Sequence, residues 1–244
     1  MGNSKFFTRK EISKNIFLIT AKNKFEINEY LIEKIRLTAS KKILNLLISG
    51  GNSLNSLLKK LSLNHNLTNK INFYLTDERL VKYNSRYSNE KNIKFYLYKN
   101  NNSKLKINFN SILGVINTFN KKNLEKISNI YSADNKFPMC IMGVGSDGHL
   151  ASIFYNDTIR KTNQGCIAVL KKNDEKFDRI SVELEYLINI PVIIFVIHGM
   201  KKQIILKKMI EFKKYTSKYP VTDLMNRSKS RIYIVTSEYF IKRL

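Results

Sequence analysis

The amino-acid sequence predicts an α/β fold with a mostly parallel central sheet. Apolar segments of strand length alternate with segments of helical periodicity, which is the pattern of consecutive βαβ units. Several strand segments are continuous apolar runs, as expected for parallel strands that are covered on both faces. Six of the nine glycines lie in three turns after predicted strands: Gly50, Gly51, Gly143, Gly145, Gly148 and Gly199.

The expected strands are short runs rich in Ile, Val, Leu and Phe. In chain order they are Ile16–Thr20, Leu44–Ser49, Ile71–Leu75, Leu113–Ile116, Met139–Met142, Cys166–Leu170, Ile180–Leu184, Ile193–His198 and Ile232–Thr236. The run at 193–198 is the strongest of these signals, and the run at 113–116 is the weakest.

Five segments between the strands show helical spacing of apolar residues. They are Glu26–Leu37, Leu54–Leu61, Ser88–Tyr98, Asn123–Ser132 and Lys202–Phe212. We expect Ser88 to cap the N-terminus of its helix, and Asn123 or a residue adjacent to it to cap the next one. The Asn- and Lys-rich stretch Lys99–Asn110 is expected to be a long solvated loop. No Pro/Gly/Ser-rich linker divides the chain, so we expect one domain over residues 1–244.

The composition excludes several classes of protein. Of 244 residues, 43% are hydrophobic and 11% aromatic, which is too many for a disordered chain. No apolar run approaches the roughly 20 residues of a membrane-spanning helix, and residues 1–7 lack the apolar segment of a signal peptide. Two cysteines, Cys140 and Cys166, form no disulfide framework. We therefore expect a cytoplasmic protein without a membrane partner.

The high positive net charge suggests a different class of function. A net charge of +24 and a pI near 9.9 are compatible with a nucleic-acid-binding protein. However, the lysines are dispersed through the whole chain, and the sequence contains no RNP phrase, zinc finger or helix-turn-helix. We expect no nucleic-acid partner and keep this class as the least favoured alternative.

The first candidate site is the turn after the expected strand Leu44–Ser49. It consists of Ser49, Gly50, Gly51, Asn52 and Ser53. Glycines allow the backbone to approach a ligand closely, and the following helix N-terminus presents free N–H groups to an anion. This turn is a candidate phosphate cradle, although it is not a Walker loop because no G-K-[ST] follows. The alternative is an ordinary tight turn with a polar cap.

The second candidate site directly follows the expected strand Ile71–Leu75. Asp77 and Arg79 lie there, with Ser88-Asn89 a few residues beyond. A carboxylate and a guanidinium at the end of a strand could hold hydroxyl groups and an oxyanion. Taken alone, a surface ion pair is the simpler interpretation.

The third candidate site is the glycine-rich turn at residues 143–149. Its G-x-G-x-x-G pattern follows a strand, but an NAD site also needs an acid about 20 residues later at the end of the next strand. Asp174 and Glu175 lie in a charged loop instead, so NAD is disfavoured. The turn contains His149, which can take a proton from water, and Asp147, which can orient the imidazole. A structural capping histidine is the alternative.

The fourth candidate site opens the helix after the strongest strand. Lys202 lies there and could reach a phosphate at the same edge of the sheet, as could Arg179.

The sequence contains no HExxH, CxxC, EF-hand loop or Cys/His cluster, so we expect no metal. A nucleophilic pair of Ser152 and His149 is a further alternative, but no G-x-S-x-G pattern surrounds Ser152.

These four segments, in this order, resemble the hallmark phrases of the 6-phosphogluconolactonase family. Those phrases are S-G-G-S-T-P, D-E-R-x-V with a later S-N, G-x-G-x-D-G-H-x-A-S-x-F-P, R-I-T and G-x-x-K. They match Ser49–Ser53, Asp77–Val81 with Ser88-Asn89, Gly143–Phe154, Arg179–Ser181 and Gly199–Lys202. The resemblance extends from about Phe17 to Thr236. The chain departs from the pattern at Asn52-Ser53-Leu54, Lys82 and Tyr155-Asn156, which affects the shape of the phosphate loop.

The resemblance implies a Rossmann-like, three-layer α/β fold. It also implies hydrolysis of 6-phospho-D-glucono-1,5-lactone to 6-phospho-D-gluconate, in the oxidative branch of the pentose phosphate pathway, without a cofactor. We expect His149 to be the general base and Asp147 to orient it. Arg79, or a backbone N–H in the turn Gly143–Gly148, is expected to stabilise the oxyanion. The expected substrate-binding residues are Ser49, Gly50, Gly51, Asn52, Ser53, Asp77, Gly145, Arg179 and Lys202.

Two alternatives remain on the same fold. Glucosamine-6-phosphate deaminases carry a glutamate shortly after the histidine, whereas here no carboxylate follows until Asp157, so the lactonase is favoured. A catalytically inactive sugar-phosphate sensor is disfavoured by the intact His149 and Arg79. We expect the enzyme to be a monomer whose partner is a small phosphorylated sugar lactone.

Overall fold

A mixed sheet of eight strands forms the centre of the computed structural model. The structure describes residues 7–40, 42–99, 107–114, 121–131, 136–155, 159–161, 166–169 and 177–244. In spatial order the strands are β1 (Phe7–Ser13), β2 (Ile16–Ala21), β12 (Arg231–Ser237), β11 (Val192–Val196), β7 (Met139–Gly143), β3 (Leu44–Ile48), β4 (Ile71–Leu75) and β6 (Asn108–Asn110). Every pair is parallel except β1 with β2.

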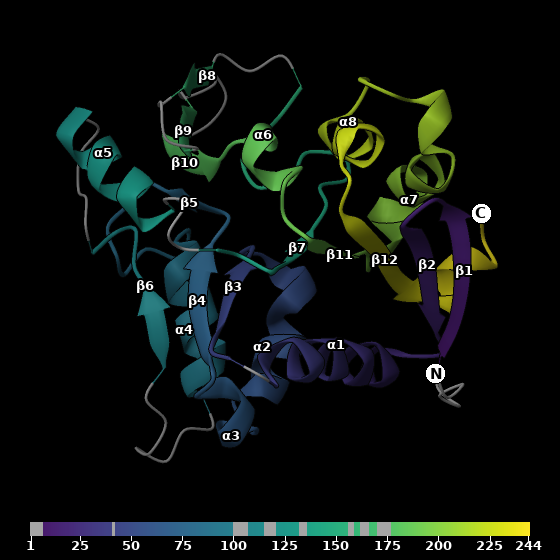
Figure 1. Cartoon of the computed structure of the whole chain (residues 1–244), viewed down its shortest axis with the longest axis horizontal. Helices are drawn as coiled ribbons and strands as arrows, with labels where there is room; N and C mark the ends of the chain where they lie inside the picture. The colour runs from purple at the N-terminus through teal and green to yellow at the C-terminus, as the bar shows by residue number, and fades with distance from the viewer. Residues whose placement is uncertain are drawn as a thin grey trace.

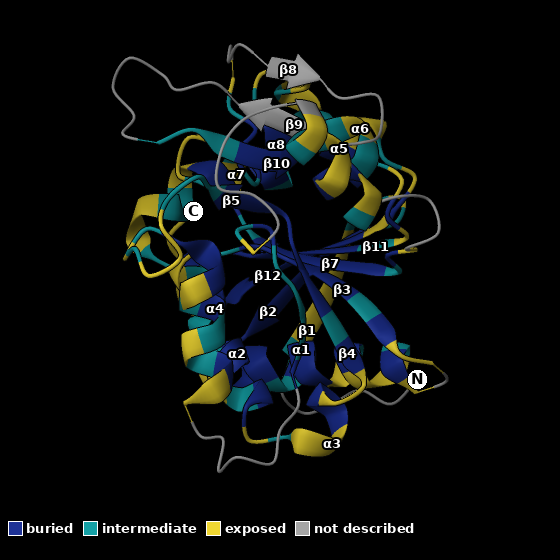
Figure 2. Cartoon of the chain, turned by 90° about the vertical axis from the view of Figure 1, so that its left-hand side faces the viewer, coloured by how far each residue is buried: buried dark blue, intermediate teal, exposed yellow. Residues whose placement is uncertain are grey.

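Helices cover both faces of this sheet (Figures 1 and 2). One layer contains α1 (Lys24–Ala39), α2 (Asn55–Leu61), α3 (His65–Thr68) and α4 (Asn89–Tyr98). The opposite layer contains α5 (Lys121–Ile130), α6 (Leu184–Leu187), α7 (Gln203–Ile210) and α8 (Pro220–Arg227). Short 3₁₀ turns η1 (Asn52–Leu54), η2 (Met200–Lys202) and η3 (Phe212–Lys214), and the terminal α9 (Glu238–Ile241), complete the chain. The expected three-layer α/β fold is confirmed.

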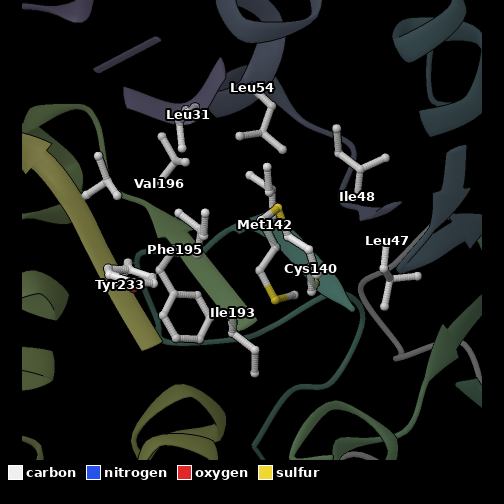
Figure 3. Packing of buried hydrophobic residues seen from close by; sticks show 14 of the residues in the cluster. Leu31, Leu47, Ile48, Leu54, Cys140, Met142, Ile193, Phe195, Val196 and Tyr233 are labelled. Carbon is white, nitrogen blue, oxygen red and sulfur yellow. The ribbon is translucent and has the colours of Figure 1, made fainter. Parts of the chain in front are cut away.

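The core lies on both sides of the central strands (Figure 3). Ile48 of β3 and Val196 of β11 point toward Leu31 of α1, whereas Ile193 and Phe195 of β11 point to the opposite face. All five side chains are at most 3% exposed. The strands are apolar at consecutive positions because both of their faces are covered, as expected for buried parallel strands.

A second, smaller sheet lies beside the central one. It contains β5 (Asp77–Arg79), β10 (Arg179–Val182), β9 (Cys166–Val169) and β8 (Ile159–Lys161), all antiparallel. The expected strands at 166–170 and 180–184 therefore pair with each other and with β5, outside the parallel sheet. The segment Asp77–Arg79 was expected as a loop, and it forms a strand because β10 supplies its backbone partners.

Other differences from the expected elements have local causes. Strand β6 forms the end of the stretch Lys99–Asn110, which was expected to be a loop. The expected strand at 113–116 is wrong at residues 113 and 114, which lie in a turn. Its last two residues are outside the described ones. Helix α5 begins at Lys121, so Asn123 lies within the helix rather than at its cap. Strand β1 escaped prediction because its centre is charged and exposed, as is common for an edge strand. The Ser88 cap of α4 is confirmed, since its hydroxyl accepts the Lys91 N–H at 3.0 Å.

Candidate active site

One cavity of about 220 Å³ lies at the carboxyl ends of the central strands. Its lining residues are Ser49, Gly50, Gly51, Asn52, Ser53, Asp77, Arg79, Asn89, Gly143, Val144, Gly145, His149, Ala151, Arg179 and Lys202. Parallel strands place their carboxyl ends at one edge, which is where open α/β sheets bind ligands. Every predicted site residue lines this cavity except Asp147, which contacts the lining residue His149.

The loop after β3 is held close to the strand next to it. The Ser49 hydroxyl accepts the Gly143 N–H at 3.0 Å. Gly51 has a φ of 91°, in the region that favours glycine. A Cβ on Gly50 would lie 2.1 Å from Asn89 Oδ1, so only a glycine lets α4 approach the loop. Gly50 and Gly51 thus leave this part of the backbone without side chains, and Asn52 and Ser53 beside them line the cavity.

Lys202 reaches this loop from the other side of the cavity. Its Nζ donates to Ser53 Oγ at 2.9 Å. Burial lowers the pKa of the Lys202 ammonium from its ordinary value. Gly199 precedes it with a φ of 109°, which turns the chain from β11 into η2. The lysine and the loop after β3 therefore form one cationic corner of the cavity.

His149 and Asp147 form a hydrogen-bonded pair at the cavity mouth. His149 Nδ1 lies 2.6 Å from Asp147 Oδ1, and the His149 N–H donates to the same oxygen at 3.3 Å. Partial burial acts to raise the pKa of the Asp147 carboxyl, but the His149 charge and its hydrogen bonds hold that pKa below its usual value. A Cβ on Gly145 would lie 2.1 Å from His149 Nδ1, so the glycine leaves room for the ring. The geometry leaves Nε2 as the ring nitrogen without this partner.

Two arginines occupy opposite strands of the small sheet. Arg79 of β5 pairs directly with Arg179 of β10, and both line the cavity. The Arg79 guanidinium donates to the Tyr87 carbonyl at 2.9 Å, while its buried Nε has no hydrogen-bond partner. A buried N–H without a partner is costly unless a ligand accepts it. With Lys202, the two arginines make the cavity suitable for an anion.

Asp77 is buried on the same face, and two hydroxyl groups bond to its carboxylate. Ser152 Oγ donates to Asp77 Oδ2 at 2.8 Å, and the Thr76 hydroxyl bonds to Oδ1 at 3.1 Å. Ser152 is fully buried. Its hydroxyl proton is directed to Asp77 rather than to His149, which argues against the nucleophilic pair considered above. Arg179 also contacts Ser152, with Nη1 at 3.4 Å from Oγ.

The sequence prediction did not assign a site role to Asn89, although the S-N phrase was noted. Asn89 begins α4, lines the cavity and donates from Nδ2 to the Asp77 carbonyl at 2.9 Å. Gly143, Val144 and Ala151 also line the cavity and were not assigned individually. A signal for Asn89 existed, because it follows the predicted helix cap Ser88.

The described residues contain no group of three or more His, Cys, Asp or Glu side chains that could hold a metal ion. Within the same residues, no helix is long and apolar enough to cross a bilayer.

Comparison with known proteins gives consistent matches over most of the chain. A family model described as glucosamine-6-phosphate isomerases/6-phosphogluconolactonase matches residues 23–233. A 6-phosphogluconolactonase of Thermotoga maritima is 31% identical over 182 residues, which cover 71% of this chain and 80% of that protein. A 6-phosphogluconolactonase of Helicobacter pylori is 28% identical over 195 residues, covering 79% and 81%.

Solved structures show the same likeness. The crystal structure of the Thermotoga maritima 6-phosphogluconolactonase has a TM-score of 0.70 at 25% identity, covering 91% of this chain and 99% of that chain. A 6-phosphogluconolactonase from Shewanella baltica has a TM-score of 0.74 at 20% identity, covering 90% and 97%. The latter similarity concerns the fold.

Proposed function

This chain belongs to the glucosamine-6-phosphate isomerase/6-phosphogluconolactonase family, and on that premise we propose that it hydrolyses 6-phospho-D-glucono-1,5-lactone to 6-phospho-D-gluconate. The observation that carries the proposal is the composition of one cavity. It joins an anion-binding corner to a carboxylate-oriented histidine, and the two come from loops that are distant in the sequence. The similarity to the 6-phosphogluconolactonases of Thermotoga maritima and Helicobacter pylori supports the lactone as substrate.

The phosphate of the substrate binds at the loop after β3. Residues 50–53 and Lys202 line the same cavity, and the Ser53 hydroxyl accepts a hydrogen bond from the Lys202 ammonium. Free N–H groups at the start of a helical segment and a cation together favour a phosphate. Arg179 adds a second positive charge to the same cavity.

His149 removes a proton from the attacking water. Asp147 is hydrogen-bonded to Nδ1, so Nε2 is the nitrogen that accepts the proton. The Asp147 carboxylate stabilises the imidazolium that forms. A lactone is an activated ester, so water attacks its carbonyl directly and no covalent intermediate on Ser152 is required.

The negative charge of the tetrahedral intermediate needs a hydrogen-bond donor. Arg79 lines the cavity, and its guanidinium is the donor we assign to the oxyanion. One such donor is typically worth about 3 kcal/mol of transition-state stabilisation. Asp77, which is buried and lines the same wall, accepts hydrogen bonds from sugar hydroxyls.

A direct assay separates the two branches of the family. The lactone, generated enzymatically from glucose 6-phosphate, is supplied to the purified chain, and 6-phosphogluconate formation is compared with spontaneous hydrolysis. Glucosamine 6-phosphate is tested in parallel for ammonia release. Catalysed lactone hydrolysis without ammonia release is the expected outcome. Deamination, or a lactone rate equal to the spontaneous one, would contradict the proposal.

A further inference from the structure

Glu78 lies between two cavity residues but points away from the cavity. It is the central residue of β5, flanked by Asp77 and Arg79. Successive side chains of a strand point to opposite faces, so two flanking residues that line the cavity direct Glu78 to the other side. Its side chain is fully buried. Burying a carboxylate is costly unless several hydrogen-bond donors compensate for the water that it loses.

The donors come from the start of α4 and from the strand itself. Oε1 accepts the N–H groups of Arg79 at 2.7 Å and Asn89 at 2.8 Å. Oε2 accepts the Glu90 N–H at 2.8 Å and the Ser88 hydroxyl at 3.1 Å. Burial raises the pKa of Glu78 to about 7, the three backbone N–H groups act in the opposite direction, and the Asp77 charge adds to the increase. The carboxylate therefore accepts four hydrogen bonds, and the three from Ser88, Asn89 and Glu90 join the start of α4 to β5.

This joint continues into the cavity wall. Asn89, held through its N–H by Glu78, uses its side chain to donate to the Asp77 carbonyl at 2.9 Å. The same side chain packs against Gly50, where a Cβ would lie 2.1 Å from Asn89 Oδ1. Arg79 is held through its own N–H, and its guanidinium is tied to the Tyr87 carbonyl at 2.9 Å just before α4. Three parts of the cavity wall thus depend on the position of α4 relative to β5.

We infer that Glu78 is a positioning residue of the site, which locks the first residues of α4 onto β5 and thereby holds Asn89, Arg79 and the loop at Gly50 around the substrate. It does not touch the substrate itself. Small displacements matter at such a site, since a misplacement of about 1 Å can cost 10²-fold in rate or binding. The kinetic readout of this inference rests on the proposed lactonase activity.

The chain offers a matched control for Glu78. Glu90 is also fully buried and lies in the first turn of α4, but its carboxylate bonds to Lys94 Nζ and Ser111 Oγ, both at 2.7 Å, away from the cavity. Glu78→Gln and Glu90→Gln each replace one buried carboxylate oxygen by an NH₂ group. In Glu78→Gln that group faces at least one backbone N–H donor at either oxygen position, so at least one hydrogen bond is lost and donors oppose each other.

The test measures KM and kcat for the lactone, the Kd of 6-phosphogluconate by calorimetry, and the melting temperature. We expect Glu78→Gln to raise KM and Kd at least about tenfold, in keeping with the cost of a displaced site, with a smaller change in kcat. Glu90→Gln is expected to lower the melting temperature while KM and Kd stay within about twofold. If Glu78→Gln does not fold, Glu78→Asp, which keeps the charge but shortens the side chain, carries the same expectation.

Unchanged KM and Kd in the folded Glu78 variant would overturn the inference, as would an equal increase in Glu90→Gln. A wild-type chain that neither hydrolyses the lactone nor binds 6-phosphogluconate would instead overturn the proposed function. The two failures are therefore distinguishable.

Discussion

Arg79 and Arg179 face each other directly across the antiparallel pair β5–β10, and both line the candidate active site. Like charges in directly opposite positions of a sheet destabilise it, by a few tenths to about 1 kcal/mol. An anionic ligand, as in the function proposed above, would compensate this repulsion. The pairing of β5 with β10 was not expected from the sequence, and it places the two arginines side by side in the wall of the cavity.

Arg179→Gln should weaken substrate binding without lowering stability. Loss of a charged partner of the phosphate is expected to raise KM about 10-fold to 100-fold, while the melting temperature stays constant or rises by about 1–3 °C because the like-charge pair is removed. The measurements are steady-state kinetics and thermal unfolding. Arg231→Gln, an exposed position at the start of β12, controls for the loss of one positive charge. A lower melting temperature with an unchanged KM would show that Arg179 serves the fold instead.

His149→Ala should lower kcat by about 10²–10⁴ and leave the Kd of 6-phosphogluconate nearly unchanged, since a general base acts on the reaction rather than on the phosphate. Asp147→Asn keeps the size of the side chain but removes the charge that stabilises the imidazolium, so a smaller decrease in kcat is expected. His65→Ala, in α3, is the control histidine. Full activity of His149→Ala would reject the general-base role.

The lowered pKa of Lys202 predicts that phosphate binding weakens at alkaline pH. Its pKa is lowered by burial, so the ammonium is charged below that lowered value and neutral above it. The Kd of 6-phosphogluconate should therefore rise as the pH increases toward the ordinary lysine pKa of 10.5, and the increase should begin below 10.5. In Lys202→Arg the guanidinium stays charged throughout, so the Kd should stay flat over this range.

Calorimetry from pH 7 to pH 10 measures this dependence without the unstable lactone. Lys201→Arg, a neighbouring exposed lysine, is the control and should keep the alkaline increase in Kd. An alkaline increase that persists unchanged in Lys202→Arg would assign the titration to another group.

Gly50→Ala should damage the site although it adds only a methyl group. The new Cβ would lie 2.1 Å from Asn89 Oδ1 and 2.7 Å from its Cβ, so the loop or α4 must move. We expect KM to rise at least about tenfold, by the sensitivity of such sites to displacement. Gly114→Ala is the comparison, because there the added Cβ meets only the side chain of Ser111 outside the cavity. Equal kinetic parameters for Gly50→Ala and the wild type would contradict the close approach of α4.

Much of the architecture could be read from local patterns. Largely apolar runs, interrupted by Asn45 and Asn72, identified the buried strands at 44–48, 71–75, 139–143 and 192–196, because a strand covered on both faces has no exposed positions. The Ser88 cap and the glycine turns were also visible, since each depends on the chemistry of a few neighbouring residues. The edge strand β1 and the small sheet were not, because charged or short strands owe their pairing to partners distant in the chain.

The site shows the same division. The residues that line the cavity were recognisable from glycine, histidine and cation positions after strands, together with the family phrases that contain them. The supporting residues are not recognisable in this way: no local pattern points to Glu78, and the sequence around Ser152 does not show that its hydroxyl bonds to Asp77. A hydrogen bond between residues 75 positions apart leaves no trace in local spacing.

By itself, the sequence determined the fold class and the types of chemical group at the sheet edge, because hydrophobic periodicity and turn chemistry are local properties. Only the tertiary structure decided how those groups are oriented. Pairing β5 with β10 brings Arg79 opposite Arg179, and joining β5 to α4 through Glu78 sets Asn89 against Gly50. These arrangements depend on contacts between segments that are distant in the chain, which packing and hydrogen bonding establish only when the whole chain is folded.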